Sequence, residues 1–174
     1  GLADRERIEV AARSGLEWLL KLQNRNGGWP TFCRGWGKLP FDRSGADLTA
    51  HALRAMHAWQ DQVGHSGIRP RRWQRSIRRG FDFLQHQKQS DGSWIPLWFG
   101  NQDHPQEENP VYGTAKVLLA YRDWQTTGEM AAQRGFQWLR DAQRADGGWG
   151  GGEALMQIRP DGISSSVEET TLAV

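Results

Sequence analysis

Hydrophobic residues recur at helical spacing along most of the chain. The segment 7–23 carries a broad apolar stripe, with apolar side chains three or four residues apart, which is the period of one helix face. Gly27 and Gly28 follow it, and glycine after an apolar stripe is a helix stop signal. Segments 46–59 and 111–124 also have helical spacing, but they open with threonine, alanine and glycine. Because small side chains allow close backbone approach, we expect these helices to form an inner layer and the Arg- and Gln-bearing helices an outer one.

A short pattern closes each expected outer helix. The sequence "LQNRNGGW" ends at Trp29, "DAQRADGGW" ends at Trp149, and the looser "HQKQSDGSW" ends at Trp94, where Gln87 stands one position early. These tryptophans are 65 and 55 residues apart, an interval typical of helical-hairpin arrays. We therefore predict an all-α fold of three hairpins, with the three tryptophans in the core, where they fasten successive helix pairs together. The predicted repeats cover approximately residues 5–60, 70–125 and 128–174.

Composition narrows the class of protein. The chain has 174 residues, enough for about one domain, with a formal net charge of +2, so nucleic acid is not an expected partner. Cys33 is the sole cysteine, which excludes an internal disulfide and favours a reducing, cytoplasmic location. The sequence has no run of 18 apolar residues and no signal-peptide layout, so we expect contact with a membrane only at its periphery. Six arginines between Arg69 and Arg79 are predicted to form the solvated face of an outer helix rather than a lipid or RNA site.

The repeated Gln–Gly–Trp turn resembles the QW motif of class II triterpene cyclases, the squalene–hopene cyclase and oxidosqualene cyclase family. "DLTAH" at 47–51 and "YGT" at 112–114 match the family as well, and the likeness spans nearly the whole chain. The resemblance implies an α/α barrel (toroid) with a hydrophobic cavity. It also implies cyclisation of a polyprenyl or triterpene substrate, started by protonation and continued as a carbocation cascade, with no metal and no other cofactor.

Two departures from the family pattern modify this expectation. The family's catalytic acid lies in an Asp-x-Asp-Asp motif, which this sequence does not contain. We therefore expect the chain to be the C-terminal portion of a longer cyclase, truncated at both ends and inactive alone. Phe32, Cys33 and Arg34 also stand where hopene cyclases carry a tyrosine and an acidic run.

Asp47 and His51 are the candidate catalytic pair. They are four residues apart and share one helical face, so Asp47 is expected to keep the imidazole protonated. The residues alone favour a local pair at a helix start, with Ser44 as N-cap and Asp47 as a capping-box partner. The resemblance instead implies that His51, with Asp47, assists an acid outside this chain by a charge-assisted hydrogen bond.

Aromatic residues are the candidate substrate-binding groups, because aromatic faces stabilise cations without acting as nucleophiles. The candidates are Trp98, Tyr112, Phe32 and Phe99. Two other functions stay open: a non-catalytic helical-repeat scaffold, or another α/α-barrel enzyme, either prenyltransferase-like or glycan-active. A zinc site is not expected, because no metal-ligand spacing accompanies Cys33. Since inner helices of an open arc expose apolar faces, we also expect a homo-oligomer.

Overall fold

The computed structural model describes residues 2–61, 67–104, 106–152 and 165–174, and it is mainly helical. Two short strands pair antiparallel, with Trp29 opposite Gly45. The elements are α1 (Leu2–Leu22), β1 (Trp29–Pro30), β2 (Ser44–Gly45), α2 (Ala46–Ala58), α3 (Pro70–Gln87), α4 (Pro110–Asp123), α5 (Met130–Asp141) and α7 (Val167–Ala173).

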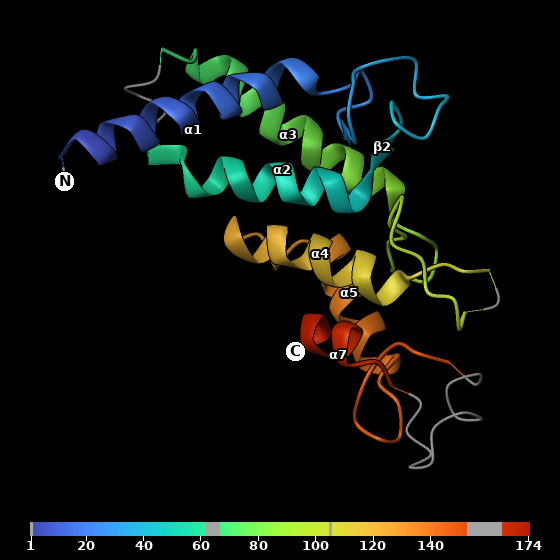
Figure 1. Cartoon of the computed structure of the whole chain (residues 1–174). Helices are drawn as coiled ribbons and strands as arrows, with labels where there is room; N and C mark the ends of the chain where they lie inside the picture. Colours follow the sequence, from blue (N-terminus) through green and yellow to red (C-terminus); the bar gives the residue numbers. More distant parts are fainter. Residues whose placement is uncertain (1, 62–66, 105, 153–164) are drawn as a thin grey trace.

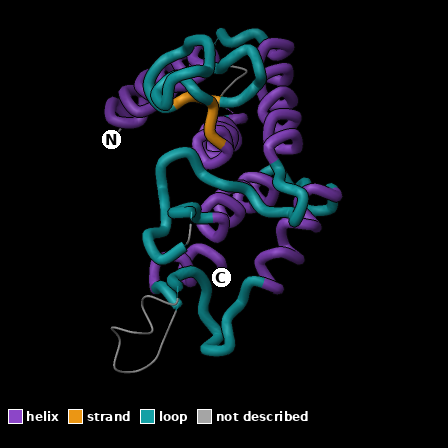
Figure 2. Tube along the Cα trace, turned by 90° about the vertical axis from the view of Figure 1, so that its right-hand side faces the viewer, coloured by secondary structure: helices purple, strands orange, loops and turns teal. Residues whose placement is uncertain are grey.

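The helices form two layers, as the sequence predicts. Helix α2 packs against α4, and α4 packs against α7, so the small-residue helices make one inner layer (Figure 1). The outer helices α3 and α5 pack behind α2 and α4. The described loops that follow the three turns lie at one end of the array, which faces the viewer in Figure 2. The arrangement is an arc of an α/α barrel.

Each turn tryptophan makes the same two hydrogen bonds. Its indole N–H donates to the carbonyl of the leucine ten residues earlier, at 2.8 Å for Trp29, 2.7 Å for Trp94 and 2.6 Å for Trp149. Its backbone N–H donates to a threonine Oγ1 of the following inner helix, at 3.0, 3.0 and 2.9 Å. One residue therefore ties the end of each outer helix to the start of its inner helix, which confirms the predicted fastening role. The threonines are Thr49, Thr114 and Thr170.

Two of the turns also rest on the backbone of the next outer helix. A Cβ atom at Gly27 would lie 2.2 Å from the carbonyl oxygen of Arg79 on α3, and one at Gly92 would lie 2.8 Å from that of Arg134 on α5. Both glycines have φ near +100° (97° and 104°), a left-handed conformation that glycine adopts without strain. Glycine is therefore required at both positions for conformation and for space.

The middle turn differs from the other two in its glutamine. Its closing backbone hydrogen bond starts at the N–H of Gln89 (2.8 Å), and this register places Lys88 where the other turns have Gln23 and Gln143. The prediction that Gln87 supplies the motif's glutamine in this turn is wrong. Gln87 lies one residue before the position that corresponds to Gln23 and Gln143, and its side chain is exposed. The Lys88 ammonium instead donates to the Gln89 carbonyl (3.2 Å).

None of the described helices is long and apolar enough to cross a membrane. The arginine-rich segment lies at the start of α3 with Arg71, Arg75 and Arg78 exposed, as expected for a solvated outer face. Cys33 is exposed in the loop after β1.

Candidate functional site

The candidate site begins at the start of α2, after the first turn. The N-cap of α2 is Gly45, which forms no side-chain capping bond, so the prediction of Ser44 as N-cap is wrong. Ser44 lies in β2, and its hydroxyl donates to Asn26 Oδ1 (2.9 Å) within the turn. Asp47 is therefore free of a capping-box role. Its Oδ1 accepts from the backbone N–H of Leu97 (3.3 Å), in the loop after the second turn.

Asp47 is a fully buried carboxyl group with an incomplete set of hydrogen bonds. Its side chain is 0% exposed, and Oδ2 has no hydrogen-bond partner among the described residues. Burial raises the pKa of Asp47 above its ordinary value, although the N–H groups of Leu97 and Leu48 oppose this. A carboxyl group of this kind holds its proton more tightly than an exposed aspartate does.

His51 lies one helical turn further along α2 and is exposed. Between the described atoms of Asp47 and His51 there is no hydrogen bond or ion pair at bonding distance. Although solvent reaches the side chain, partial desolvation lowers the pKa of His51, and the Lys116 ammonium lowers it further, against the charge of Asp47. The expectation that Asp47 keeps the imidazole protonated is therefore wrong, because these two effects outweigh the carboxylate.

Two of the four predicted aromatic residues contact each other. Phe99 stacks on Tyr112, with ring centroids 4.7 Å apart and an angle of 27° between planes. Tyr112 is buried on α4, and the Lys116 ammonium lies 5.1 Å from its ring centroid, a cation–π geometry. Burial raises the pKa of Tyr112, and the charges of Asp47 and Glu168 add to this rise. Tyr112 thus lies in the same electrostatic neighbourhood as Asp47.

The other two predicted aromatic residues lie on the loops at the same end. The Trp98 indole donates to Thr31 Oγ1, which joins the loop after the second turn to the loop after the first. Trp98 is 48% exposed and Phe32, beside Thr31, is 71% exposed. Trp98 and Phe32 therefore lie on neighbouring loops, and neither side chain is buried in the core.

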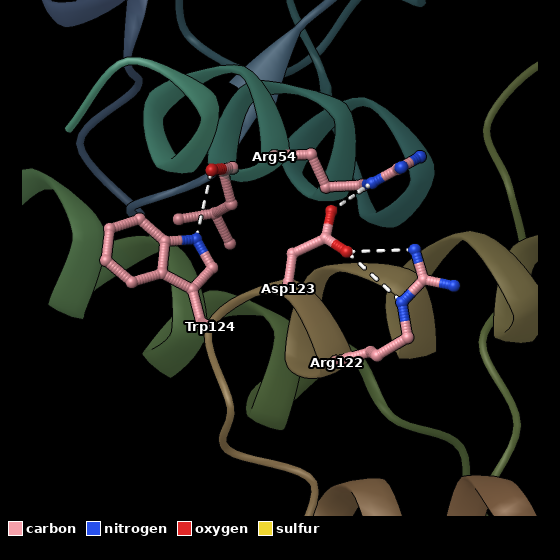
Figure 3. A network of polar contacts seen from close by, with 5 residues as sticks. Arg54, Arg122, Asp123 and Trp124 are labelled. Carbon is pink, nitrogen blue, oxygen red and sulfur yellow. Dashed lines mark hydrogen bonds and ion pairs between the residues drawn. The ribbon is translucent and has the colours of Figure 1, made fainter. Parts of the chain in front are cut away.

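Sequence reasoning missed the polar contacts between the inner helices. Arg54 Nε lies 2.7 Å from Asp123 Oδ2, and Arg122 also contacts Asp123 (2.9 Å) (Figure 3). The Trp124 indole donates to the Leu53 carbonyl (3.0 Å). Although burial opposes it, the hydrogen bonds from Arg54 and Arg122 lower the pKa of Asp123. The two helices are thus fixed together by residues 69 and 71 positions apart in the chain.

Lys116 was missed for a different reason. It lies four residues after Tyr112, so the i,i+4 rule for helices could have paired them. Lys116 belongs to none of the sequence motifs, so no pattern indicated a role for it. No cluster of three or more metal-ligating side chains occurs in the part of the chain that the structure describes.

An arc of helical hairpins with two layers, fastened by Gly-Trp turns, defines the class of α/α-barrel proteins. Within this class, the model of the squalene–hopene cyclase C-terminal domain matches residues 2–171, and the chain belongs to this family. It is 33% identical over 155 residues to enfumafungin synthase of Hormonema carpetanum, covering 79% of this chain and 11% of that protein. It is 28% identical to the squalene–hopene cyclase of Zymomonas mobilis, covering 84% and 22%.

The solved structures include a similar chain in ent-copalyl diphosphate synthase from Streptomyces platensis. The TM-score is 0.55 at 25% identity, and the match covers 88% of this chain and 28% of that one. The chain thus spans between 11% and 28% of the length of these relatives.

Proposed function

We propose that the chain forms part of a class II terpene cyclase that converts a polyprenyl or triterpene substrate into a cyclic product. One observation carries the proposal: in a squalene–hopene cyclase C-terminal domain, a buried carboxyl group and an imidazole on α2 lie in the electrostatic neighbourhood of Tyr112 on α4, and Phe99 of the preceding loop stacks on that tyrosine. The relatives named above include a squalene–hopene cyclase, which supports a long isoprenoid as the substrate class.

In this proposal, an acid outside this chain donates a proton to a carbon–carbon double bond of the substrate. His51 assists that acid by donating an N–H hydrogen bond to its carboxyl group, which stabilises the conjugate base that remains. Desolvation and Lys116 lower the pKa of His51, and the charge of Asp47 opposes this fall.

The aromatic residues act after protonation. Each new carbon–carbon bond forms from the electron pair of the next double bond and leaves a cation further along the substrate. Phe99, Trp98 and Phe32 lie on loops with ring surface exposed, and they present ring faces to these cations and keep water away. Tyr112 is stacked against Phe99 and has the Lys116 ammonium over its ring, so it supports the Phe99 ring, and the ammonium repels cations nearby. We therefore place the cationic intermediates at the ring surface that Phe99 exposes.

The test uses the chain alone and a chimera in which it replaces the matching segment of the Zymomonas mobilis squalene–hopene cyclase. Both are incubated with squalene and shorter polyprenyl substrates, and products are identified by gas chromatography and mass spectrometry. We expect cyclic product from the chimera and none from the chain alone. Product from the chain alone would show that the acid lies within it. A chimera that is folded by circular dichroism and makes no product would favour the non-catalytic scaffold.

The residue assignment is tested in the same chimera. His51→Ala should lower the rate on the order of a hundredfold, as loss of one charge-stabilising hydrogen bond does, with unchanged helical content. The matched control is His86→Ala, because His86 is exposed on the outer helix α3, and this variant should keep the parent rate. Equal rates in both variants would remove His51 from the mechanism.

A further inference from the structure

A buried carboxyl group on α7 holds the loop that carries Trp98 and Phe99. Glu169 is 5% exposed, and both of its carboxyl oxygens accept hydrogen bonds from outside α7. Oε1 accepts from the side-chain amide of Asn101 (3.2 Å), and Oε2 accepts from the backbone N–H of Gly151 (3.0 Å). The Asn101 amide also donates to the Gly151 carbonyl (3.0 Å). These three residues therefore form a closed triangle of hydrogen bonds, called the α7 clamp below.

Asn101 is fixed from its other side as well. Its Oδ1 accepts from the backbone N–H of Asp103 (2.9 Å), and its own backbone N–H donates to the Glu107 carbonyl (3.1 Å). A Cβ atom at Gly100 would lie 2.6 Å from the same carbonyl oxygen, so the backbone passes Glu107 too closely for a side chain at this position. Both polar atoms of the Asn101 amide are thus occupied, and the backbone beside it has little freedom.

The position of the Phe99 ring depends on this backbone, because Phe99 lies two residues before Asn101. The ring stacks on Tyr112 and is 50% exposed. Its exposed surface is where the proposed function places the cationic intermediates. On the other side of the ring, the Trp98 indole donates to Thr31 Oγ1. Phe99 is therefore held between two anchors, of which one is this hydrogen bond and the other is the α7 clamp.

We propose that Glu169 is a positioning residue, which acts through Asn101 to hold Phe99 on Tyr112 and thereby determines at which stage the cascade ends. This inference rests on the proposed function. When the clamp is open, the ring face of Phe99 moves away from the cation that it stabilises. That cation then adds the oxygen of a water molecule, which releases a proton to solvent, or it loses a proton from the neighbouring carbon to leave a double bond. Either reaction ends the cascade before the last ring has formed.

The first test measures the position of Phe99 and needs no catalysis. A para-fluorophenylalanine replaces Phe99 in the chain, and its fluorine NMR line reports the ring stacked against it. Tyr112→Leu gives the reference position of the line without that ring. In Glu169→Ala and in Asn101→Ala the line should move most of the way to this reference, because both variants open the clamp. The matched control is Glu107→Gln, which changes an exposed acid of the same loop and should keep the parent line.

Two further variants separate the clamp from a general loss of packing. Glu169→Gln fills the same space, but its amide can accept only one of the two hydrogen bonds, so the line should move less than in Glu169→Ala. The double variant Glu169→Ala/Asn101→Ala should move the line no further than either single variant, because the two residues act through one contact. A parent line in both single variants, or effects that add in the double variant, would overturn the proposal.

The second test measures the product distribution of the chimera described above. In Glu169→Ala, the ratio of incompletely to fully cyclised product should rise about threefold to tenfold, the size expected for one lost cation–π contact. Glu107→Gln should keep the parent ratio. A merely structural role would lower the total yield and leave this ratio unchanged, and that result would also overturn the proposal. A parent chimera without product would instead count against the proposed function, and the fluorine line would still decide whether Glu169 positions Phe99.

Discussion

The hydrogen bond from the Trp94 backbone to Thr114 gives a sharp test of how the turns stabilise the fold. Thr114→Val keeps the shape of the side chain but removes the oxygen that accepts this bond at 3.0 Å. Both residues are 0% exposed, so no water can replace the hydroxyl. The Trp94 N–H is then left buried and unpaired.

The expected loss follows from two opposing contributions. A buried unpaired N–H costs about 1–3 kcal/mol, and the methyl group that replaces the hydroxyl returns up to about 0.8 kcal/mol of apolar burial. We expect a net loss of about 1–2 kcal/mol in the free energy of unfolding, or about 2–8 °C in Tm for a protein of this size. Urea denaturation followed by tryptophan fluorescence measures it.

The third turn supplies the matched control. Thr170 makes the same bond to Trp149 at 2.9 Å, but both residues are only half-buried. Water can therefore satisfy the N–H in Thr170→Val, and the loss should stay below about 0.5 kcal/mol. Hydrogen exchange at the Trp94 amide should accelerate only in Thr114→Val. Equal losses at Thr114 and Thr170 would refute the role given to burial in the turn.

Three further predictions concern glycine and titratable groups. Gly135→Ala should lower the free energy of unfolding by about 1–2 kcal/mol in urea denaturation, because the added Cβ would lie 2.8 Å from Cζ3 of Trp94 and this overpacking exceeds the helix-propensity gain. Gly15→Ala on α1 should raise it by up to about 1 kcal/mol, because no described atom lies within 4 Å of its Cβ position and alanine has the higher helix propensity. The stability from Asp123 is present above its ordinary pKa and is lost as pH falls through the lowered value, so Asp123→Asn should cost about 0.5–1 kcal/mol at pH 7 and nothing in strong acid. The pKa of Asp47 is raised, so its stabilising protonated form is lost as pH rises; Asp47→Asn should raise Tm at pH 8 and give no gain at pH 4. A pH-independent change in Tm for either variant would contradict its pKa direction.

The repeated features were predictable from the sequence because they are local and recur. The spacing of Trp29, Trp94 and Trp149 predicted the hairpins, the small residues at the start of the inner helices predicted the two layers, and the family resemblance drew attention to Asp47 and His51. The density of charge identified the arginine-rich segment as the exposed start of an outer helix.

The remaining features depend on contacts between distant segments. The protonation of His51 depends on Lys116 of another helix, and Asp123 meets Arg54 across 69 residues. Ser44 was expected to cap a helix, but strand pairing with the first turn uses it instead. Gln87 resembles the motif's glutamine in the sequence. Only the backbone register of the turn shows that Lys88 occupies the position that glutamine has in the other two turns.

The replacement of glutamine by Lys88 has a mechanical consequence. Between the first turn and α3, the buried Gln23 amide holds the Ser76 hydroxyl and carbonyl. Between the second turn and α5, Ala131 stands 55 positions after Ser76 and has no hydroxyl to offer, and the connection is a solvent-exposed hydrogen bond from the Trp138 indole to Asp91 Oδ2, at 2.9 Å. Because water competes for an exposed hydrogen bond more than for a buried one, we expect the contact between the second turn and α5 to open on heating before the contact between the first turn and α3.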